Sequence, residues 1–175
     1  MANHIVLYNP AIPQNTGNIM RTCVATNTTL HLIKPLGFEL DDKKMKRAGL
    51  DYVKDLSMKV YENWEEFIDA NPGKYYFTTR YSKKRYSDFD MSDTTLEHYF
   101  IFGHEHDGIP KKLLQLHLDE CMRIPMSKKT RSLNVSNCAA LIVYEALRQQ
   151  NFPDLFDIET CLLYTSDAAD EGLGV

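Results

Sequence analysis

The sequence predicts an α/β fold built on a mostly parallel sheet with helices on its faces. Short apolar runs of strand length recur along the chain, helix-like segments separate most of them, and polar loops follow several of the runs. Alternating strands and helices are typical of parallel sheets that are covered on both faces. The predicted strands are residues 5–8, 30–33, 56–61, 75–79, 99–102 and 122–125.

The first predicted strand, residues 5–8, leads into a polar, glycine-containing turn within residues 9–21 and then into a helical pattern through Cys23. The next three strands follow with helix-like segments between them. Asn71-Pro72-Gly73 and residues 90–95 read as turns inside one domain, because no linker or low-complexity stretch accompanies them.

The fifth strand stops at Gly103, in a loop that contains a second glycine and ends at Pro110, a residue favoured at helix starts. The sixth strand ends in a basic loop and then a long helix over about residues 133–150. Ser132, Asn134 and Ser136 are each suited to bond the unpaired N–H groups at the start of this helix.

That last helix is apolar on more than one face, with Val135, Ala139, Leu141, Ile142 and Tyr144 among its apolar residues. A helix with such wide apolar coverage is expected to be buried on two sides. In a domain this small, a second copy of the chain is a natural cover, so we expect a homodimer through this helix. An internal core helix is the alternative.

Three polar loops follow predicted strands and are expected to meet at one edge of the sheet, where open α/β sheets bind their ligands. They lie within residues 9–21, 103–110 and 126–136. Lys128, Lys129 and Arg131 place positive charge just before a helix start, which favours a charged ligand. A capped helix behind a solvated basic loop is the simpler alternative.

Composition indicates an ordinary globular protein, with 43% hydrophobic and 25% charged residues in 175 positions. No apolar run is long enough to span a membrane and no signal-like segment opens the chain, so the cytoplasm is expected.

The four cysteines lack metal-type spacing, so we expect neither zinc nor disulfides. We expect one domain over residues 1–160 and a non-native or disordered tail over residues 161–175.

The formal charge of −4 argues weakly against a nucleic-acid partner. The last 14 residues carry three acids and no bases, however, so residues 1–161 have a formal charge of only −1. The basic residues of this part are clustered, which is compatible with one basic face for RNA, and Tyr81 and Tyr86 bracket the second cluster as possible stacking residues. The clusters are Lys43, Lys44, Lys46 and Arg47; Arg80, Lys83, Lys84 and Arg85; and Lys128, Lys129 and Arg131.

Three sequence motifs resemble those of the SPOUT superfamily of knotted RNA methyltransferases, in the SpoU branch that methylates ribose 2′-hydroxyls. They are the Asn-x-Gly-Asn-x-x-Arg motif at Asn15–Arg21, the Phe-Gly-x-Glu-x-x-Gly motif at Phe102–Gly108, and the Ile-Pro-Met…Ser-Leu-Asn-Val-Ser motif at Ile124–Ser136. Within the branch, residues 9–18, 41–43, 47–52 and 143–146 look like those of enzymes that methylate the wobble nucleotide of tRNA. The resemblance covers residues 5–153.

The resemblance implies S-adenosylmethionine as cofactor, a C-terminal trefoil knot that holds it, and a homodimer. It also implies tRNA as the partner, recognised at the anticodon stem-loop, with Lys128, Lys129 and Arg131 as candidate RNA-binding residues. A glycine at position 103 suits a backbone that a ligand approaches closely. The residues that map to the cofactor site are Phe77, Thr78, Gly103, Ile124, Met126, Ser132, Leu133 and Asn134.

For catalysis the resemblance points to Arg21. A guanidinium stays protonated at ordinary pH, so binding the adjacent phosphate and stabilising the developing alkoxide are better roles for Arg21 than acting as a base. Asn15 and Asn18 are expected to order their loop. Glu105 and Ser136 are expected to orient Arg21 or the ribose.

The sequence also allows a metal site and other functions to be considered. His104 and His106 are two residues apart, so on an extended segment both imidazoles would face the same way and could bind one ion. Two histidines are too few ligands for a metal site, however, and we expect no metal. Asp107 stands where relatives often have a basic or neutral residue, which weakens the case for a phosphate contact there. The alternative functions are methylation of another tRNA or rRNA position, or a catalytically silent RNA-binding module; Arg21, Glu105, Asn134 and Ser136 argue against the silent module.

Overall fold

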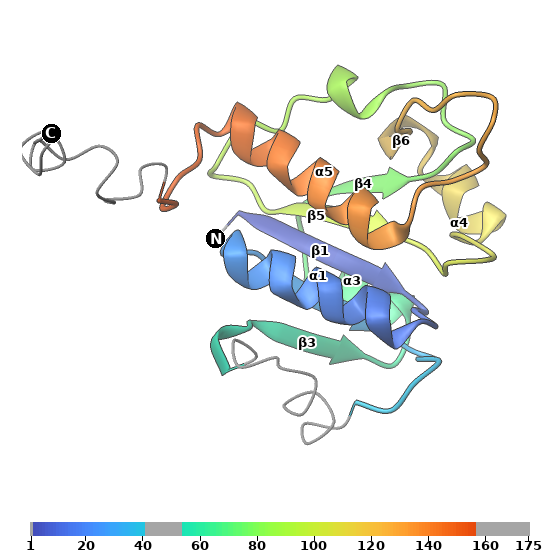
Figure 1. The fold of residues 1–175 in the computed structure, drawn as a ribbon, viewed down its shortest axis with the longest axis horizontal. Helices are drawn as coiled ribbons and strands as arrows, with labels where there is room; N and C mark the ends of the chain where they lie inside the picture. The colour runs from blue at the N-terminus through green and yellow to red at the C-terminus, as the bar shows by residue number, and fades with distance from the viewer. Residues whose placement is uncertain (1, 41–53, 157–175) are drawn as a thin grey trace, which may run out of the picture.

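The fold was analysed in a computed structural model that describes residues 2–40 and 54–156. Its centre is a six-stranded sheet in the order β3-β2-β1-β5-β4-β6, in which every pairing is parallel (Figure 1). The α/β prediction is therefore confirmed. The strands are β1 (Asn3–Tyr8), β2 (Thr29–Ile33), β3 (Met58–Tyr61), β4 (Lys74–Thr78), β5 (His98–Phe102) and β6 (Cys121–Met122).

Helices cover both faces of the sheet, as a parallel sheet requires. Helices α1 and α5 lie side by side on one face, and α3 and α4 lie behind it (Figure 1). Alternate residues of β1 face the two layers: Ile5 and Leu7 pack with α1 and α5, whereas Val6 packs with α3 and α4. The helices are α1 (Pro13–Ala25), α3 (Trp64–Ala70), α4 (Lys111–Leu116) and α5 (Val135–Gln149), with short 3-10 turns η2 (Tyr86–Asp88) and η3 (Leu118–Glu120).

The sequence placed the first five strands to within two residues, but it predicted a sixth strand that is too long and begins one residue late. The predicted strand at 122–125 is only Cys121–Met122, beside β4. Beyond it the chain pairs with a loop instead of a strand: Arg123 N–H donates to Lys84 O, and Arg123 O accepts from Tyr86 N–H. Pro125 has no N–H with which to continue a ladder.

Helix α1 begins earlier than its motif suggested. The polar turn is limited to residues 9–12, and Asn15, Gly17 and Asn18 lie within the first turns of α1 rather than in a loop. The residue before the helix, Ile12, offers no side-chain cap. The carboxylate of Glu105, from the loop after β5, accepts the backbone N–H groups before the helix instead. The sequence around α1 alone cannot reveal a partner that lies so far away in the chain.

Helix α5 is close to the predicted 133–150 and begins after Asn134, whose side chain accepts from Ser136 N–H. Asn134 is therefore the cap, and Ser132 and Ser136 are not. Its inner face, which includes Ala139, Ile142 and Val143, is buried, while Tyr144 on its outer face is 47% exposed.

Among the described residues no helix combines the length and the apolar character needed to cross a bilayer. The basic group at Lys43, Lys44, Lys46 and Arg47 lies outside the described residues, as does the predicted tail over 161–175. The trefoil knot and the domain boundary at residue 160 stay predictions.

Candidate active site

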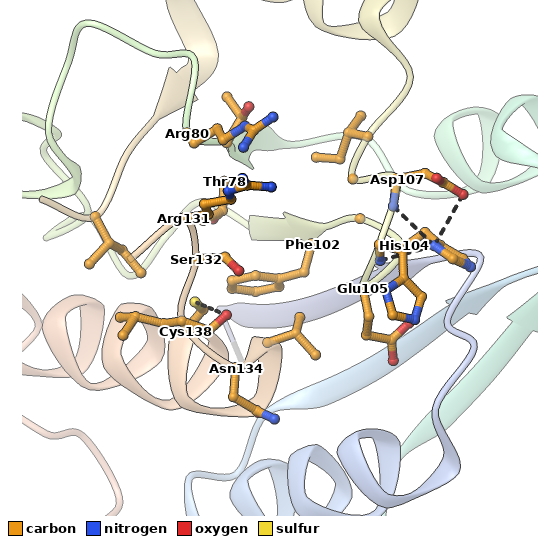
Figure 2. Close-up of a pocket in the computed structure, with 18 of the residues that line it drawn as sticks. Thr78, Arg80, Phe102, His104, Glu105, Asp107, Arg131, Ser132, Asn134 and Cys138 are labelled. Carbon is orange, nitrogen blue, oxygen red and sulfur yellow. Dashed lines mark hydrogen bonds and ion pairs between the residues drawn. The ribbon is translucent and has the colours of Figure 1, made fainter. Parts of the chain in front are cut away.

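A cavity of about 630 Å³ opens at the carboxyl edge of the sheet. Figure 2 shows Thr78, Arg80 and Arg131 on one side of it and His104, Glu105 and Asp107 on the other. This volume lies in the range of small-molecule sites. Loops after β4, β5 and β6, the start of α1 and the start of α5 all contribute, so the predicted meeting of the three polar loops is confirmed.

Of the sixteen candidate catalytic, cofactor-binding and RNA-binding residues predicted from the sequence, ten line this cavity and six do not. Phe77 is fully buried in the core on the α3 and α4 face, and Ser136 is buried behind Asn134. The ten are Asn15, Thr78, Gly103, Glu105, Ile124, Met126, Arg131, Ser132, Leu133 and Asn134; the other six are Asn18, Arg21, Phe77, Lys128, Lys129 and Ser136.

Glu105 fastens the β5 loop to the start of α1. Its carboxylate accepts hydrogen bonds from Ala11 N–H at 2.9 Å, Ile12 N–H at 3.0 Å and the Asn15 amide at 3.3 Å. Burial alone raises the pKa of Glu105, but these hydrogen bonds outweigh it and the pKa is lowered overall. The ionised side chain thus supplies the negative charge and the acceptors that the N-terminus of α1 lacks.

Asn15 joins this loop to the start of α5. It donates to Glu105 through Nδ2 and accepts from Asn134 Nδ2 at 2.9 Å through Oδ1. Asn134 in turn accepts through Oδ1 from the N–H and the hydroxyl of Ser136. One continuous chain of hydrogen bonds therefore connects all three motif segments around the cavity.

Gly103 lies where two stretches of backbone nearly touch. A Cβ at this position would lie 2.3 Å from the carbonyl carbon of Gly108 and 2.4 Å from the nitrogen of Ile109, closer than any real contact. Gly108 itself has φ of +72°, a conformation that glycine adopts without strain. A glycine at this position was expected to let a ligand approach the backbone, but closure of the loop itself already requires it.

Thr78, at the edge of this cavity, carries a buried polar atom without a hydrogen-bond partner in the described part of the chain. Its Oγ1 is buried and makes no hydrogen bond among the described residues, and Thr78 lines the cavity at the end of β4. Buried hydroxyls are normally satisfied, so this oxygen is suited to bond a ligand. Apolar wall residues, including Phe102, Ile124 and Leu133, would pack against an aromatic ring.

The His104 to His106 segment forms a turn. Nδ1 of His104 accepts from the N–H groups of His106 and Asp107, both at 3.2 Å, and lies 3.4 Å from the Asp107 carboxylate. Glu105 between them is bound to α1. Among the described residues no three His, Cys, Asp or Glu side chains gather as a metal site would need.

A cationic group with an exposed tyrosine stands at the mouth of the cavity. Nη2 of Arg80 donates to Tyr81 Oη at 2.8 Å, and the Arg80 guanidinium carbon lies 4.9 Å from the centre of the Tyr81 ring. Lys111 lies 6.0 Å from the same centre. The hydrogen bond from Arg80, its charge and that of Lys111 lower the pKa of the Tyr81 hydroxyl.

The other basic residues are distributed differently from the prediction. In the second cluster Lys84 pairs with Asp119 and Arg85 pairs with Asp88, which leaves Arg80 as its member at the cavity. Lys128 and Lys129 are exposed on the loop before α5. Arg21 is exposed on α1, six residues after Asn15 and therefore about 9 Å further along the helix axis.

Sequence reasoning missed several wall residues, among them Ile12, Thr79, Phe102 and Cys138. Cys138 follows Asn134 by four positions, and helix periodicity alone puts such a pair on one face. The sequence could not identify the apolar residues as part of a cavity wall, because an apolar residue at the end of a strand is usually part of the hydrophobic core.

Comparisons with known proteins agree with this geometry. Residues 2–144 match the model of the SpoU rRNA Methylase family. A protein of Bacillus subtilis (strain 168), provisionally named tRNA (cytidine(34)-2′-O)-methyltransferase, is 53% identical over 156 residues, which cover 89% of this chain and 98% of the relative.

Two solved structures have a similar fold. One, from a study of the methylation of C/U34 on tRNA, has a TM-score of 0.77 and 35% identity, and the match covers 85% of this chain and 95% of the other. The second is a SpoU methyltransferase from Streptomyces viridochromogenes in complex with AdoMet. It has a TM-score of 0.72 and 25% identity, and the match covers 85% of this chain and 57% of the other.

Proposed function

Because this chain belongs to the SpoU methylase family, we propose that it transfers a methyl group from S-adenosylmethionine to the ribose 2′-hydroxyl of nucleotide 34 in tRNA. The observation that carries the proposal is the cavity at the carboxyl edge, whose walls are the three motif segments joined by Glu105, Asn15 and Asn134. Two relatives that are matched over nearly their whole length concern this position of tRNA.

The residues present fit S-adenosylmethionine, which when bound supplies a methyl group on a sulfonium. Thr78 offers an unpartnered hydroxyl, and Phe102, Ile124 and Leu133 offer apolar walls for the adenine ring. Gly103 keeps the backbone of the β5 loop closed around this space. The related structure with AdoMet supports the same cofactor. Met126, Ser132 and Asn134 complete the proposed cofactor site, and Phe77 supports it from the core.

The protein must also hold the ribose in line with the methyl donor. Positioning of this kind lowers a barrier by about 7–11 kcal/mol in well-aligned systems. Arg21 is proposed to bind the phosphate beside the target ribose and to stabilise the developing alkoxide, with Asn18 next to it on the exposed side of α1. Lys128, Lys129 and Arg131 are proposed to bind further phosphates of the anticodon stem-loop.

The proposed enzyme works as a homodimer through α5. The outer face of this helix carries the half-buried Leu141 and the exposed Tyr144, beside α1 (Figure 1). A second copy packed there would remove these apolar groups from water. Sedimentation at micromolar concentration tests this: a dimer is expected, and a monomer that still methylates tRNA would refute it.

An rRNA substrate is the second candidate, since the description of the matching family names rRNA. The 53% identical relative and the C/U34 structure favour tRNA, because the match spans nearly their full lengths. Incubation with labelled S-adenosylmethionine and either tRNA or ribosomal RNA separates the two. Label is expected in tRNA; label in ribosomal RNA alone would exclude the tRNA proposal.

A further inference from the structure

Tyr81 is an exposed aromatic ring at the mouth of the cavity. The residue is 59% exposed, although it is large and lines the cavity beside Thr79 and Arg80. Tyrosines usually bury much of their ring, and an exposed ring at the entrance of a ligand site therefore needs an explanation.

The loop that carries Tyr81 is fixed on both sides of it. Thr79 N–H donates to Met122 O at 2.9 Å, and the buried Ser82 hydroxyl donates to Cys121 O at 2.6 Å. Tyr81 N–H adds a hydrogen bond to Thr79 Oγ1 at 3.3 Å. The ring is thus presented to solvent by a backbone bound to β6, so little ordering is needed when a ligand contacts it.

The charges around the ring are positive. The cationic groups of Arg80 and Lys111 lie over the ring, 4.9 Å and 6.0 Å from its centre, and Arg131 lies on the same cavity wall as Arg80 (Figure 2). Among the described residues none of these three forms an ion pair with an acidic side chain. An aromatic face with unpaired cations beside it has the chemistry of a surface that binds a base and its phosphates.

We propose that Tyr81 is the stacking platform for a base adjacent to the methylated nucleotide, with Arg80 and Lys111 contacting the phosphates on either side of that base. Stacking one neighbour on a rigid ring would hold the target ribose over the cavity while its own base stays free. This inference rests on the proposed function and adds the residue that positions the RNA strand.

Tyr86, the other tyrosine that brackets this basic segment, does not fit the role. It is half-buried and packs against the core on the α1 and α5 face. Since any aromatic ring can stack whereas the hydroxyl of Tyr81 is bound to Arg80, the proposal requires the ring and not the hydroxyl.

The test compares Tyr81→Leu with Tyr81→Phe in the full-length protein, with Leu118→Ala as an exposed apolar control outside the cavity wall. The RNA is an anticodon stem-loop with 2-aminopurine on either side of the target nucleotide. Loss of one stacked base corresponds to roughly a 5- to 150-fold loss of affinity. Tyr81→Leu is expected to lose this much, with S-adenosylmethionine affinity unchanged, whereas Tyr81→Phe and Leu118→Ala stay within about three-fold.

Salt dependence and fluorescence separate stacking from charge. Tyr81→Leu is expected to keep the wild-type slope of log affinity against log salt and to abolish the emission change of one 2-aminopurine. Arg80→Gln is expected to lower the slope by about 0.7, the contribution of one single-strand phosphate contact.

Equal affinity and emission for wild type and Tyr81→Leu would overturn the platform, even if methylation proceeds normally. If Tyr81→Phe is as weak as Tyr81→Leu, the hydroxyl and not the ring is responsible, and the platform is also wrong. A wild-type protein that binds S-adenosylmethionine but neither binds nor methylates RNA would instead refute the proposed function itself.

Discussion

Asn134 Nδ2 donates a 2.9 Å hydrogen bond to Asn15 Oδ1, although the two residues lie 119 positions apart. Replacing Asn134 by alanine leaves the buried Asn15 amide oxygen unsatisfied, at a typical cost of about 1–3 kcal/mol in the free energy of unfolding. Replacing Asn15 should also destabilise the fold, although water can reach the exposed Asn134 amide. Because the two share one bond, the double variant should cost less than the sum of the single variants. Urea unfolding measures these energies, and Asn137→Ala, an exposed neighbour on α5, is the control. Fully additive losses would mean that the bond carries no coupling.

Gly103→Ala should damage the cavity more than it damages the fold. The new Cβ would lie 2.3 Å from backbone, so the β5 loop must open, and we expect S-adenosylmethionine affinity to fall at least ten-fold by calorimetric titration. Gly17→Ala is the matched control, because a Cβ there meets nothing within 4 Å. In the interior of α1 that change should raise the unfolding free energy by about 0.5–1 kcal/mol. Normal cofactor binding by Gly103→Ala would contradict the role of loop closure.

Stability should fall with pH below about 6.5 because of His31. This side chain is fully buried between His4, at 2.9 Å, and Tyr61, at 3.0 Å, and burial lowers its pKa to about 3, with the charges of His4 and Lys59 adding to the effect. The unfolded chain then binds a proton that the folded chain excludes, so stability is full above pH 6.5 and is lost as the pH falls toward 3.

The unfolding free energy should drop by up to roughly 1.4 kcal/mol per pH unit from this one proton. Burial also lowers the pKa of His4, despite its hydrogen bond to Glu97, so His4 acts in the same direction. His31→Gln keeps a polar group for both partners but does not titrate, and it should flatten the profile between pH 6.5 and 5. Exposed His106→Gln should not. Identical profiles for wild type and His31→Gln would exclude His31 as the cause.

Arg21→Ala should separate chemistry from cofactor binding. We expect S-adenosylmethionine affinity within a few-fold of wild type and methyl transfer lower by roughly two orders of magnitude, the usual loss when one charge-stabilising donor is removed. Arg21→Lys should recover little, since an ammonium lacks the planar fork. Lys74→Ala, an exposed cation at the start of β4, is the control. Near-normal single-turnover rates for Arg21→Ala would make the arginine structural.

The same assay distinguishes Arg21 from the loop lysines. Replacing both Lys128 and Lys129 by alanine should weaken tRNA binding and flatten its salt dependence, because each removes a phosphate contact. With saturating tRNA, the single-turnover rate of this variant should approach that of wild type. A rate defect that tRNA concentration cannot relieve would place these lysines in the chemistry.

Local pattern was enough to predict five of the six strands of the sheet. Alternation located those strands, whereas the family resemblance assigned Thr78, Gly103 and Asn134 to the cofactor site, and all three line the cavity. The early start of α1 could not be predicted, because the group that accepts the backbone N–H hydrogen bonds just before the helix is the Glu105 carboxylate. Glu105 lies about 90 residues away in the chain. Likewise nothing in the sequence separates Tyr81 from Tyr86, since only tertiary packing buries one and exposes the other.

The methyl transfer is tested most directly by mapping ribose methylation, nucleotide by nucleotide, in tRNA incubated with the purified protein and S-adenosylmethionine. Mass spectrometry of nuclease fragments would locate the methyl group. We predict one added methyl per molecule, on the 2′-oxygen of nucleotide 34, and none with RNA that carries a 2′-deoxyribose at that position. A methyl group on a base or at another nucleotide, or no transfer by folded protein that binds the cofactor, would contradict it.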